Sequence, residues 1–327
     1  MNNSKEKVKL DEVLKFLFST SNKVIIKLLN SVFNENFSED EVDLTISNNE
    51  FVEDTLEIIR GDMFLDILNK HHSKKHSYHI EFQTKNDSSM VIRMFEYGFR
   101  KSIEQSRKDD SIDIKTIYFP KQKVIFFEEN KNIKDTLDLK IVLPNNSEFI
   151  YSVDVMKYWQ YDDKKLLENK MYPLIPLQLF LLRKDLIAAS KNNNIEKLKE
   201  LSYKARNLAK LLAYESRDLL NSKEILDEDF HKMLLAIQNL IEYLNRNYIN
   251  DEYLEDEVIK LTKSLYDPEI EKKGIEKGIE KGIKEGIEKG ERKKAIEIAK
   301  SLLDVLDTKT IAIKTGLTIE EVESLKN

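Results

Sequence analysis

Two carboxylates and a neighbouring amide occur in segments of the sequence that are otherwise typical of buried strands. Asp66 interrupts the apolar run MFLDILN, and Glu81 lies with Gln83 in the segment YHIEFQ. A carboxylate that is removed from water without a partner is energetically costly. Oxygen ligands of this kind are what a hard divalent cation prefers, so the two acids indicate a metal site.

The spacing of the two acids fits a β-hairpin. A hairpin centred on residues 73–74 would place Asp66 directly opposite Glu81 on one face of a sheet. Like charges opposed in this way repel each other unless a cation or a proton lies between them. Because side chains alternate along a strand, Gln83 shares the face of Glu81, whereas Phe82 points to the other face.

The elements that must position these residues are predicted from hydrophobic periodicity. Helical spacing over residues 8–34 predicts one or two helices, and residues 88–108 predict another. A helix between strands of one sheet indicates an α/β or α+β fold with a mixed sheet flanked by helices. Trp159 and its neighbouring tyrosines are predicted to lie in the core. The predicted strands are EVDLTIS (41–47), TLEII (55–59), MFLDILN (63–69), YHIEFQ (78–83), KTIYFP, KVIFFE, LKIVLP and FIYSVDVMKYW.

The chain divides by composition into four parts. Residues 1–160 carry the strands, and residues 161–267 are almost entirely helical in pattern. Residues 268–290 contain a four-residue glycine repeat, and residues 291–327 predict a small helical hairpin. In the hairpin, Thr318 and Glu321 match a capping box. The spacing is similar to a helix-turn-helix, but the acidic second helix disfavours contact with phosphates, so packing against a neighbour is expected.

The glycine repeat, EKKGIEKGIEKGIKEGIEKG over residues 271–290, has two interpretations. Each glycine lowers helix stability by roughly 0.8–1 kcal/mol relative to alanine, which favours a solvated linker. The isoleucine of each repeat forms a stripe that drifts around a helix, which favours a helix for homo-oligomer formation through close glycine contacts. The sequence leaves both interpretations open.

Composition limits the function classes. The 327 residues include no cysteine, which excludes disulfides and thiolate zinc sites. The net charge is −6, but residues 60–127 hold 13 Lys+Arg against 9 Asp+Glu, so a basic excess surrounds the candidate site. We expect a cytoplasmic protein without membrane association, because no leader pattern and no long apolar run occur.

The order Asp66, Glu81, Gln83 resembles the PD-(D/E)XK nuclease signature. The form is that of the Rpn family of recombination-promoting nucleases and transposase-like proteins. The segments LDILN, YHIEFQ and RMFEYGFR resemble the core of that family, and Asp11, Lys15 and Phe18 resemble its N-terminal signature. The GIEKG repeat and the TGLT-containing tail are also similar. The resemblance implies a restriction-endonuclease-like core and a DNA endonuclease linked to recombination or mobile elements, with Mg²⁺ (or Mn²⁺ or Ca²⁺) as cofactor.

Carried onto this chain, the resemblance implies a role for each site residue. Asp66, Glu81 and the Phe82 carbonyl would hold the metal, whose bound water would attack phosphorus. Gln83 stands where the broader class has a lysine, and it can orient a water but adds no positive charge. The expected DNA contacts, which share one helix face at i, i+4 and i+7, are Arg93, Tyr97 and Arg100. The unranked candidates for a third acidic ligand are Asp11, Asp40 and Glu53.

Other interpretations remain open. The chain could be a catalytically weak or inactive nuclease fold that serves as an oligomeric DNA-binding or scaffold protein. An acidic cross-strand pair is also compatible with a solvated sheet edge, and Arg93 with a surface ion pair to Glu96 or Glu104. Histidines 71, 72, 76 and 79 invite a zinc or nickel site, but a loop explains the first three equally well.

Overall fold

A computed structural model of the 327-residue chain describes residues 10–50, 60–70, 75–84, 86–106, 116–266, 286–287 and 290–325. The described residues fall into two compact units, Met1–Tyr266 and Asp267–Asn327. The candidate site lies in the first unit.

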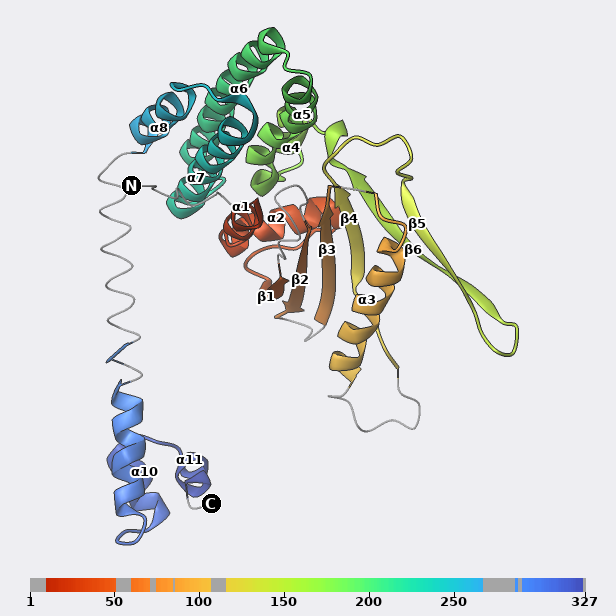
Figure 1. The fold of residues 1–327 in the computed structure, drawn as a ribbon. Helices are drawn as coiled ribbons and strands as arrows, with labels where there is room; N and C mark the ends of the chain where they lie inside the picture. Colours follow the sequence, from red (N-terminus) through yellow and green to blue (C-terminus); the bar gives the residue numbers. More distant parts are fainter. Residues whose placement is uncertain are drawn as a thin grey trace, which may run out of the picture. The chain divides into compact units, whose positions relative to one another are not determined.

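A six-stranded mixed sheet organises the first unit, with the strand order β1-β2-β3-β4-β6-β5. Strands β1, β2 and β3 are antiparallel neighbours, whereas β3 with β4 and β4 with β6 are parallel pairs. The last pair, β5 with β6, is antiparallel and forms a twisted ribbon (Figure 1). The strands are β1 Val42–Glu50, β2 Arg60–Asn69, β3 Lys75–Gln83, β4 Lys121–Phe126, β5 Thr136–Val142 and β6 Glu148–Lys157.

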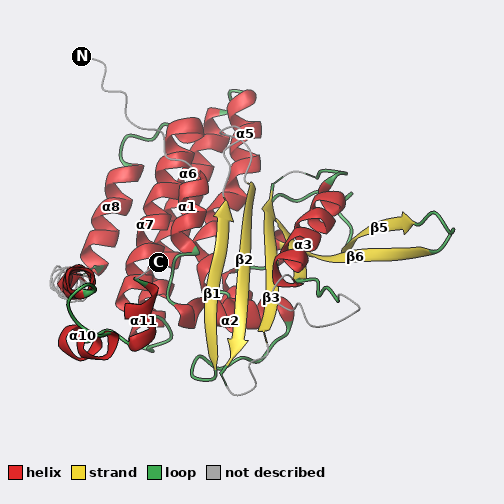
Figure 2. Cartoon of the chain, turned by 90° about the horizontal axis from the view of Figure 1, so that it is seen from below, coloured by secondary structure: helices red, strands yellow, loops and turns green. Residues whose placement is uncertain are grey.

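Helices cover both faces of the sheet. Helices α1 (Leu10–Leu17) and α2 (Asn22–Phe33) bury apolar stripes on one face, where Phe18 stacks on Phe82 with ring centroids 4.6 Å apart. Helix α3 (Met90–Ser106) lies next to β3 on the other face (Figure 2). There Met90 and Met94 pack in a second apolar cluster with β4 and β6. The mixed α/β arrangement predicted from the sequence is therefore present.

The helical region that follows the sheet belongs to the same compact unit as the sheet. One continuous apolar core runs from α1 through the sheet to α8. The predicted division between residues 1–160 and 161–267 is therefore not a division between compact units, whereas the change after residue 266 is. The α-helices are α4 Asp163–Glu168, α5 Arg183–Lys191, α6 Ile195–Asn221, α7 Asp227–Leu244 and α8 Leu254–Leu265. Two 3₁₀ helices, Tyr158–Gln160 and Tyr172–Leu182, and a π-helical turn, Asn245–Ile249, lie between or beside them.

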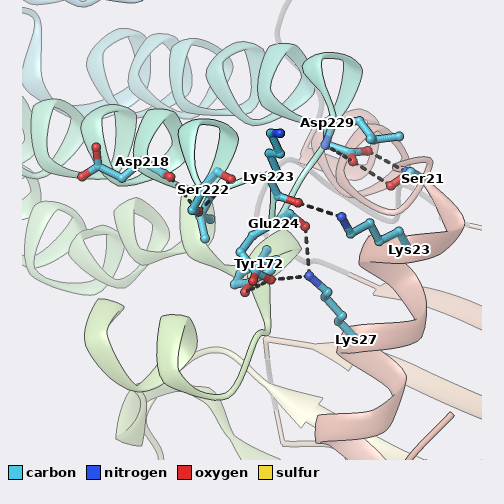
Figure 3. A network of polar contacts seen from close by, with 11 residues as sticks. Ser21, Lys23, Lys27, Tyr172, Asp218, Ser222, Lys223, Glu224 and Asp229 are labelled. Carbon is cyan, nitrogen blue, oxygen red and sulfur yellow. Dashed lines mark hydrogen bonds and ion pairs between the residues drawn. The ribbon is translucent and has the colours of Figure 1, made fainter. Parts of the chain in front are cut away.

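Polar contacts fasten α2 to the connection between α6 and α7 (Figure 3). The Ser21 amide and hydroxyl both donate to the buried carboxylate of Asp229, each at 2.6 Å. Lys27 pairs with Glu224, which also accepts a hydrogen bond from the Tyr172 hydroxyl at 3.0 Å. The Asp229 carboxylate also accepts a hydrogen bond from the Leu226 amide at the start of α7. One carboxylate therefore caps α7 and anchors the beginning of α2 to it.

The second unit is a small helical assembly. A helix over residues 290–302 packs with α10 (Thr308–Thr315) and α11 (Ile319–Ser324) around Ile311, Leu317 and Val322. Gly316 ends α10 with φ +75°, a conformation that favours glycine. The predicted capping box is confirmed, because the Thr318 hydroxyl accepts from the Glu321 amide and the Glu321 carboxylate accepts from the Thr318 amide.

The strand and helix predictions have mixed outcomes. The predicted helical stretch 8–34 forms two helices, and the segments 41–47, 63–69 and 78–83 lie in β1, β2 and β3. The prediction of a strand at KTIYFP is wrong, since residues 116–120 form no regular element. Segment 55–59 and most of the glycine repeat lie outside the described residues. None of the helices in the described ranges combines the length and apolar composition that crossing a bilayer requires.

An acid in the helical region should make folding stability depend on pH. Burial, together with the nearby Asp163 and Asp218, raises the pKa of Glu215 to about 8 from an ordinary 4.5. The folded state therefore holds a proton that the unfolded chain releases above about pH 4.5, and stability falls as the pH rises towards 8. Glu215→Gln should raise the free energy of unfolding at pH 7 on the order of 1–2 kcal/mol. Urea unfolding at pH 4 should show no such gain; an equal gain at both pH values would contradict the assignment.

Candidate functional site

Residues 78–83 of strand β3 are buried on both faces of the sheet, although one of the two faces carries polar side chains. Tyr78, Ile80 and Phe82 point into the core beneath α1 and α2. His79, Glu81 and Gln83 point to the opposite face, where their exposed fractions are 0%, 3% and 1%. Polar groups buried to this degree must find partners or incur a desolvation cost.

The register of the β2–β3 hairpin differs from the prediction. Asp66 lies opposite Ser77, and the residue opposite Glu81 is Asp62. Asp66 and Glu81 share a face but are separated by four residues along the strands, about 13 Å. One ion with ligand distances of about 2.0–2.6 Å cannot contact both carboxylates, so the predicted Asp66–Glu81 pairing is wrong.

The observed register creates a different row of acids. Glu50 on β1 lies opposite Asp62 on β2, which in turn lies opposite Glu81 on β3. Three acidic residues therefore occupy one row across three neighbouring strands. The side chains of Glu50 and Asp62 are not among those described, so the row is a statement about backbone positions. The sequence would have indicated this row only if the register of the β2–β3 hairpin had been predicted correctly.

Glu81 is only partly compensated by its neighbours. One carboxylate oxygen, Oε1, accepts a hydrogen bond from the Gln83 amide and lies 3.9 Å from the Arg93 guanidinium. The other oxygen, Oε2, is buried and has no hydrogen-bond partner among the described residues. Arg93 itself is shared, since its guanidinium lies 3.3 Å from the Asp87 carboxylate. The pair Glu81 and Gln83 therefore presents one free acceptor within a buried polar site.

Asp66 is fully engaged in contacts of its own. Its carboxylate accepts a hydrogen bond from Ser77 and lies 3.1 Å from the amino groups of both Lys101 and Lys75. Burial alone would raise the pKa of Asp66, but the hydrogen bonds from Ser77, Lys101 and Lys75 outweigh burial and lower the pKa below its ordinary value. Asp66 thus has the environment of a structural ion pair.

Aromatic and amide groups fill the space between the two acids. The ring of Phe64 stacks on His79 with centroids 4.1 Å apart, and Tyr97 meets the same imidazole edge-on at 5.9 Å. Gln122 on β4 lies 3.0 Å from His79 Nδ1 and donates to the Met94 carbonyl at 2.7 Å. His79 is therefore held in a packed polar network beneath α3, which was not predicted.

The predicted DNA-contact residues do not share an exposed face of α3. Arg93 and Tyr97 face the sheet, where they meet Glu81 and His79. Arg100 is 71% exposed and pairs with Glu96 at 2.5 Å. The inward position one residue later is taken by Lys101, whose amino group lies over the Phe64 ring, 5.7 Å from its centroid, and pairs with Asp66. Only Arg93 of the three lies beside the candidate site.

The remaining predicted ligands are placed only in part. The Phe82 carbonyl belongs to a central strand paired on both sides, and its role as a ligand stays a prediction. Asp40 is exposed near Lys70, at the opposite end of the hairpin from Glu81. The side chain of Asp11 is not described, and Glu53 lies outside the described residues. Among the described side chains, no group of three or more His, Asp or Glu is arranged to hold a metal.

The histidine alternative receives no support from neighbouring ligands. His76 points to the other face and lies 6.1 Å from the Phe37 ring, whereas residues 71 and 72 lie outside the described part.

Searches of family models, of curated proteins and of solved structures found no match to the chain. The proposed function therefore depends on the site itself and on the motif resemblance.

The ion pairs of Asp66 predict a pH-dependent contribution to stability. Asp66→Asn should lower the free energy of unfolding at pH 7 by about 1–3 kcal/mol, because Lys101 is only 12% exposed and loses its charged partner. Since the pKa of Asp66 is lowered, its contribution is present at neutral pH and disappears as the pH falls through the folded-state pKa. Urea unfolding at pH 7 and near pH 2, below the lowered pKa of Asp66, measures this. A deficit of equal size at both pH values would refute the ion-pair explanation.

The approach of α3 to β4 predicts a cost for a single added methyl group. A Cβ on Gly98 would lie 2.8 Å from Gln122 Oε1 and 2.9 Å from the Phe119 ring. Alanine normally stabilises a helix by about 1 kcal/mol over glycine, but overpacking costs about 1–3 kcal/mol. We expect Gly98→Ala to lower the melting temperature. Gly286→Ala is the matched control, because a methyl there meets no atom within 4 Å, and it should not destabilise.

Proposed function

We propose that the chain is a divalent-metal-dependent DNA endonuclease that hydrolyses phosphodiester bonds, with its metal site at Glu81 rather than at Asp66. The observation that carries the proposal is the buried Oε2 of Glu81, which has no hydrogen-bond partner among the described side chains. It lies in the row that Glu50, Asp62 and Glu81 form across three strands. A buried carboxylate with a free oxygen is unfavourable unless a cation or a proton compensates it.

The residues present fit a hard divalent ion such as Mg²⁺, Mn²⁺ or Ca²⁺. Glu81 would provide a ligand through its free oxygen, and Asp62 and Glu50 occupy the row positions from which further carboxylates could reach the same ion. Such an ion, when bound, lowers the pKa of a coordinated water and stabilises charge on a phosphate. Asp66 has no part in this site, since lysines already neutralise it.

The chain's own residues would prepare the site in two ways. The Gln83 amide donates to Glu81 Oε1 and so leaves Oε2 as the available oxygen. Arg93 is 24% exposed at its side chain, and its guanidinium lies between Glu81 and Asp87, where it could contact a phosphate oxygen at the edge of the site. Gln83 carries no charge. Among the described residues, Arg93 is the cation that pairs with Glu81.

The wider context agrees with this proposal. A mixed sheet with helices on both faces is what a restriction-endonuclease-like core requires, and the Asp-Glu-Gln order resembles the Rpn family. The basic excess of residues 60–127 suits a nucleic-acid partner. A cytoplasmic location, a link to recombination or mobile elements, and self-association through the glycine repeat remain parts of the same proposal.

A second function is favoured by one specific contact. Arg93 lies close enough to Glu81 to offset part of its charge without a metal. A catalytically weak or inactive nuclease fold, retained as a DNA-binding or scaffold protein, would keep such an internal cation. In that case Gln83 marks a lost catalytic lysine.

Assays of DNA cleavage and of metal binding distinguish the endonuclease from the inactive DNA-binding or scaffold protein. We expect the chain to nick supercoiled plasmid with Mg²⁺ or Mn²⁺, and Glu81→Gln and Asp62→Asn to lower the rate by about 100-fold or more, since each removes a ligand. Titration calorimetry with Mn²⁺ should show weaker binding for the same two variants. Glu50→Gln should weaken Mn²⁺ binding less.

Two controls define the site. Asp43→Asn, an exposed acid on β1, should leave cleavage and Mn²⁺ affinity unchanged. Asp66→Asn, assayed where it is folded, should keep the Mn²⁺ affinity within about threefold. If Asp66→Asn instead abolishes Mn²⁺ binding while Asp62→Asn does not, the site assignment fails. If no metal binds and no DNA is cut while DNA is still retained, the inactive scaffold is the correct function.

A further inference from the structure

The β5–β6 ribbon extends past the strands that support the rest of the sheet (Figure 1). Strand β6 pairs with β4 only from Asp154 to Lys157, so residues 148–153 pair with β5 alone. Large apolar side chains stay exposed near the ribbon tip, and these are Val142, Leu143, Phe149 and Ile150, which are 43–68% exposed. Two-stranded ribbons are marginally stable in water, so a covered ribbon would be more stable.

Strand β5 ends the sheet, and no described strand pairs with its outer hydrogen-bonding edge. The Leu143 amide donates to Ser147 at 2.8 Å, and the Val155 amide donates to Asp135 at 2.9 Å. Odd-numbered residues of β5 therefore direct their amides and carbonyls towards β6. In an antiparallel pair the intervening residues direct theirs the other way. The outward-facing residues of β5 are Thr136, Asp138, Lys140 and Val142.

We propose that this edge binds β5 of a second copy of the chain, antiparallel about a two-fold axis at Leu139. In this register Asp138 of each copy lies opposite Lys140 of the other. Thr136 lies opposite Val142, and Leu137 lies opposite Ile141. All the hydrogen-bonded pairs then join outward-facing residues, as an antiparallel ladder requires.

Charge complementarity selects both the partner and the register. The strand TLDLKIV is chemically self-complementary about its central leucine, with an acid on one side and a base on the other. Moving the partner by two residues in one direction sets Asp138 against Asp138. Moving it in the other direction sets Lys140 against Lys140 and Thr136 against Pro144. Like charges directly opposite each other destabilise a sheet. Of these three registers, only the one centred on Leu139 places each acid opposite a base.

The apolar faces also match in this register. Leu139 of each copy meets its equivalent across the axis, with Leu137 and Ile141 on either side, on the face that continues the apolar cluster beneath α3. Within one ribbon Lys140 pairs with Glu148. The Asp138 carboxylate accepts hydrogen bonds from the Ser152 and Thr136 hydroxyls at 2.7 and 3.4 Å, and among the described residues no cation pairs with it. A single mid-strand lysine normally protects an edge against association, but here the acid two residues away neutralises it.

This inference stands apart from the proposed nuclease function and from the glycine repeat. Glu81 lies on β3, separated from β5 by β4 and β6. Association through β5 requires neither a metal nor DNA. It also requires no residue of 271–290.

A charge-swap series on the full-length chain tests the register. Asp138→Lys and Lys140→Asp should each raise the dimer dissociation constant roughly tenfold or more in analytical ultracentrifugation, because each replaces two attractive pairs with two repulsive ones. The double variant should recover the original value. An equimolar mixture of the two single variants should form a heterodimer. Circular dichroism and thermal melting show that each variant is folded.

Cysteine cross-linking tests the axis directly, since the chain has no cysteine. Leu139→Cys should form a disulfide-linked dimer on mild oxidation. The two copies of residue 139 would form a non-hydrogen-bonded antiparallel pair, whose Cα atoms lie about 4.5 Å apart, within reach of a disulfide. Leu137→Cys is the matched control on the same face, and its two copies lie too far apart to cross-link.

Three results would overturn the proposal. The first is a wild-type chain that remains monomeric at high micromolar concentration. The second is a dimer that the single charge variants leave unchanged, which would assign association to another surface such as the glycine repeat. The third is equal cross-linking of Leu139→Cys and Leu137→Cys.

Discussion

Burial of β3 on both of its faces is the constraint that organises the first unit. The strand lies at the centre of the sheet, and from Tyr78 to Gln83 its side chains are shielded from bulk water on both faces. Its apolar face needs only packing, whereas each polar residue on the other face needs a compensating group. Helix α3 supplies these groups in sequence, with Arg93 beside Glu81 and Tyr97 beside His79, and one turn later Lys101 beside Asp66 of the neighbouring β2.

Compensation is uneven along this polar face, and the unevenness distinguishes a structural ion pair from a candidate site. Asp66 has two lysines and a hydroxyl donor, so an added cation would find its charge already neutralised. Glu81 has an amide donor and a distant, shared arginine, and its Oε2 finds no hydrogen-bond partner in the described part of the chain. A group that the fold leaves uncompensated is where an external ligand contributes most.

The apolar face of β3 explains why the helical region joins the sheet in one unit. Phe82 stacks between Phe18 of the N-terminal helices and Phe127, which follows β4. Phe127 in turn meets Phe180 edge-on at 6.1 Å, within the 3₁₀ helix Tyr172–Leu182 of the helical region. The chain of rings continues the core across the boundary that composition suggested at residue 160. Composition distinguishes helical from mixed segments, but it does not reveal which apolar faces meet.

The sequence could predict the face of each side chain on β3 but not the strand register. Alternation correctly assigned Glu81 and Gln83 to one face and Phe82 to the other, because a strand has a period of two. It could not detect the error in the hairpin register, because a shift by an even number of residues returns every side chain to the same face. The register depends on the loop and on pairs such as Phe64 with His79 and Asp66 with Ser77, which an isolated sequence does not display. The inward turn of Lys101 was missed for a similar reason, since the sheet-facing stripe of α3 is defined by Met90 and Met94 against β4.

The sheet places its two sources of possible function at a distance from each other. The row through Glu81 lies in the antiparallel half formed by β1, β2 and β3, whereas the free edge belongs to β5 in the other half. The parallel strand β4 separates the halves and is itself fixed to the polar face through Gln122. A change in the outward-facing charges of β5 therefore alters groups that have no contact with β3. Association through that edge and chemistry at Glu81 are physically separable, and each can be lost while the other remains.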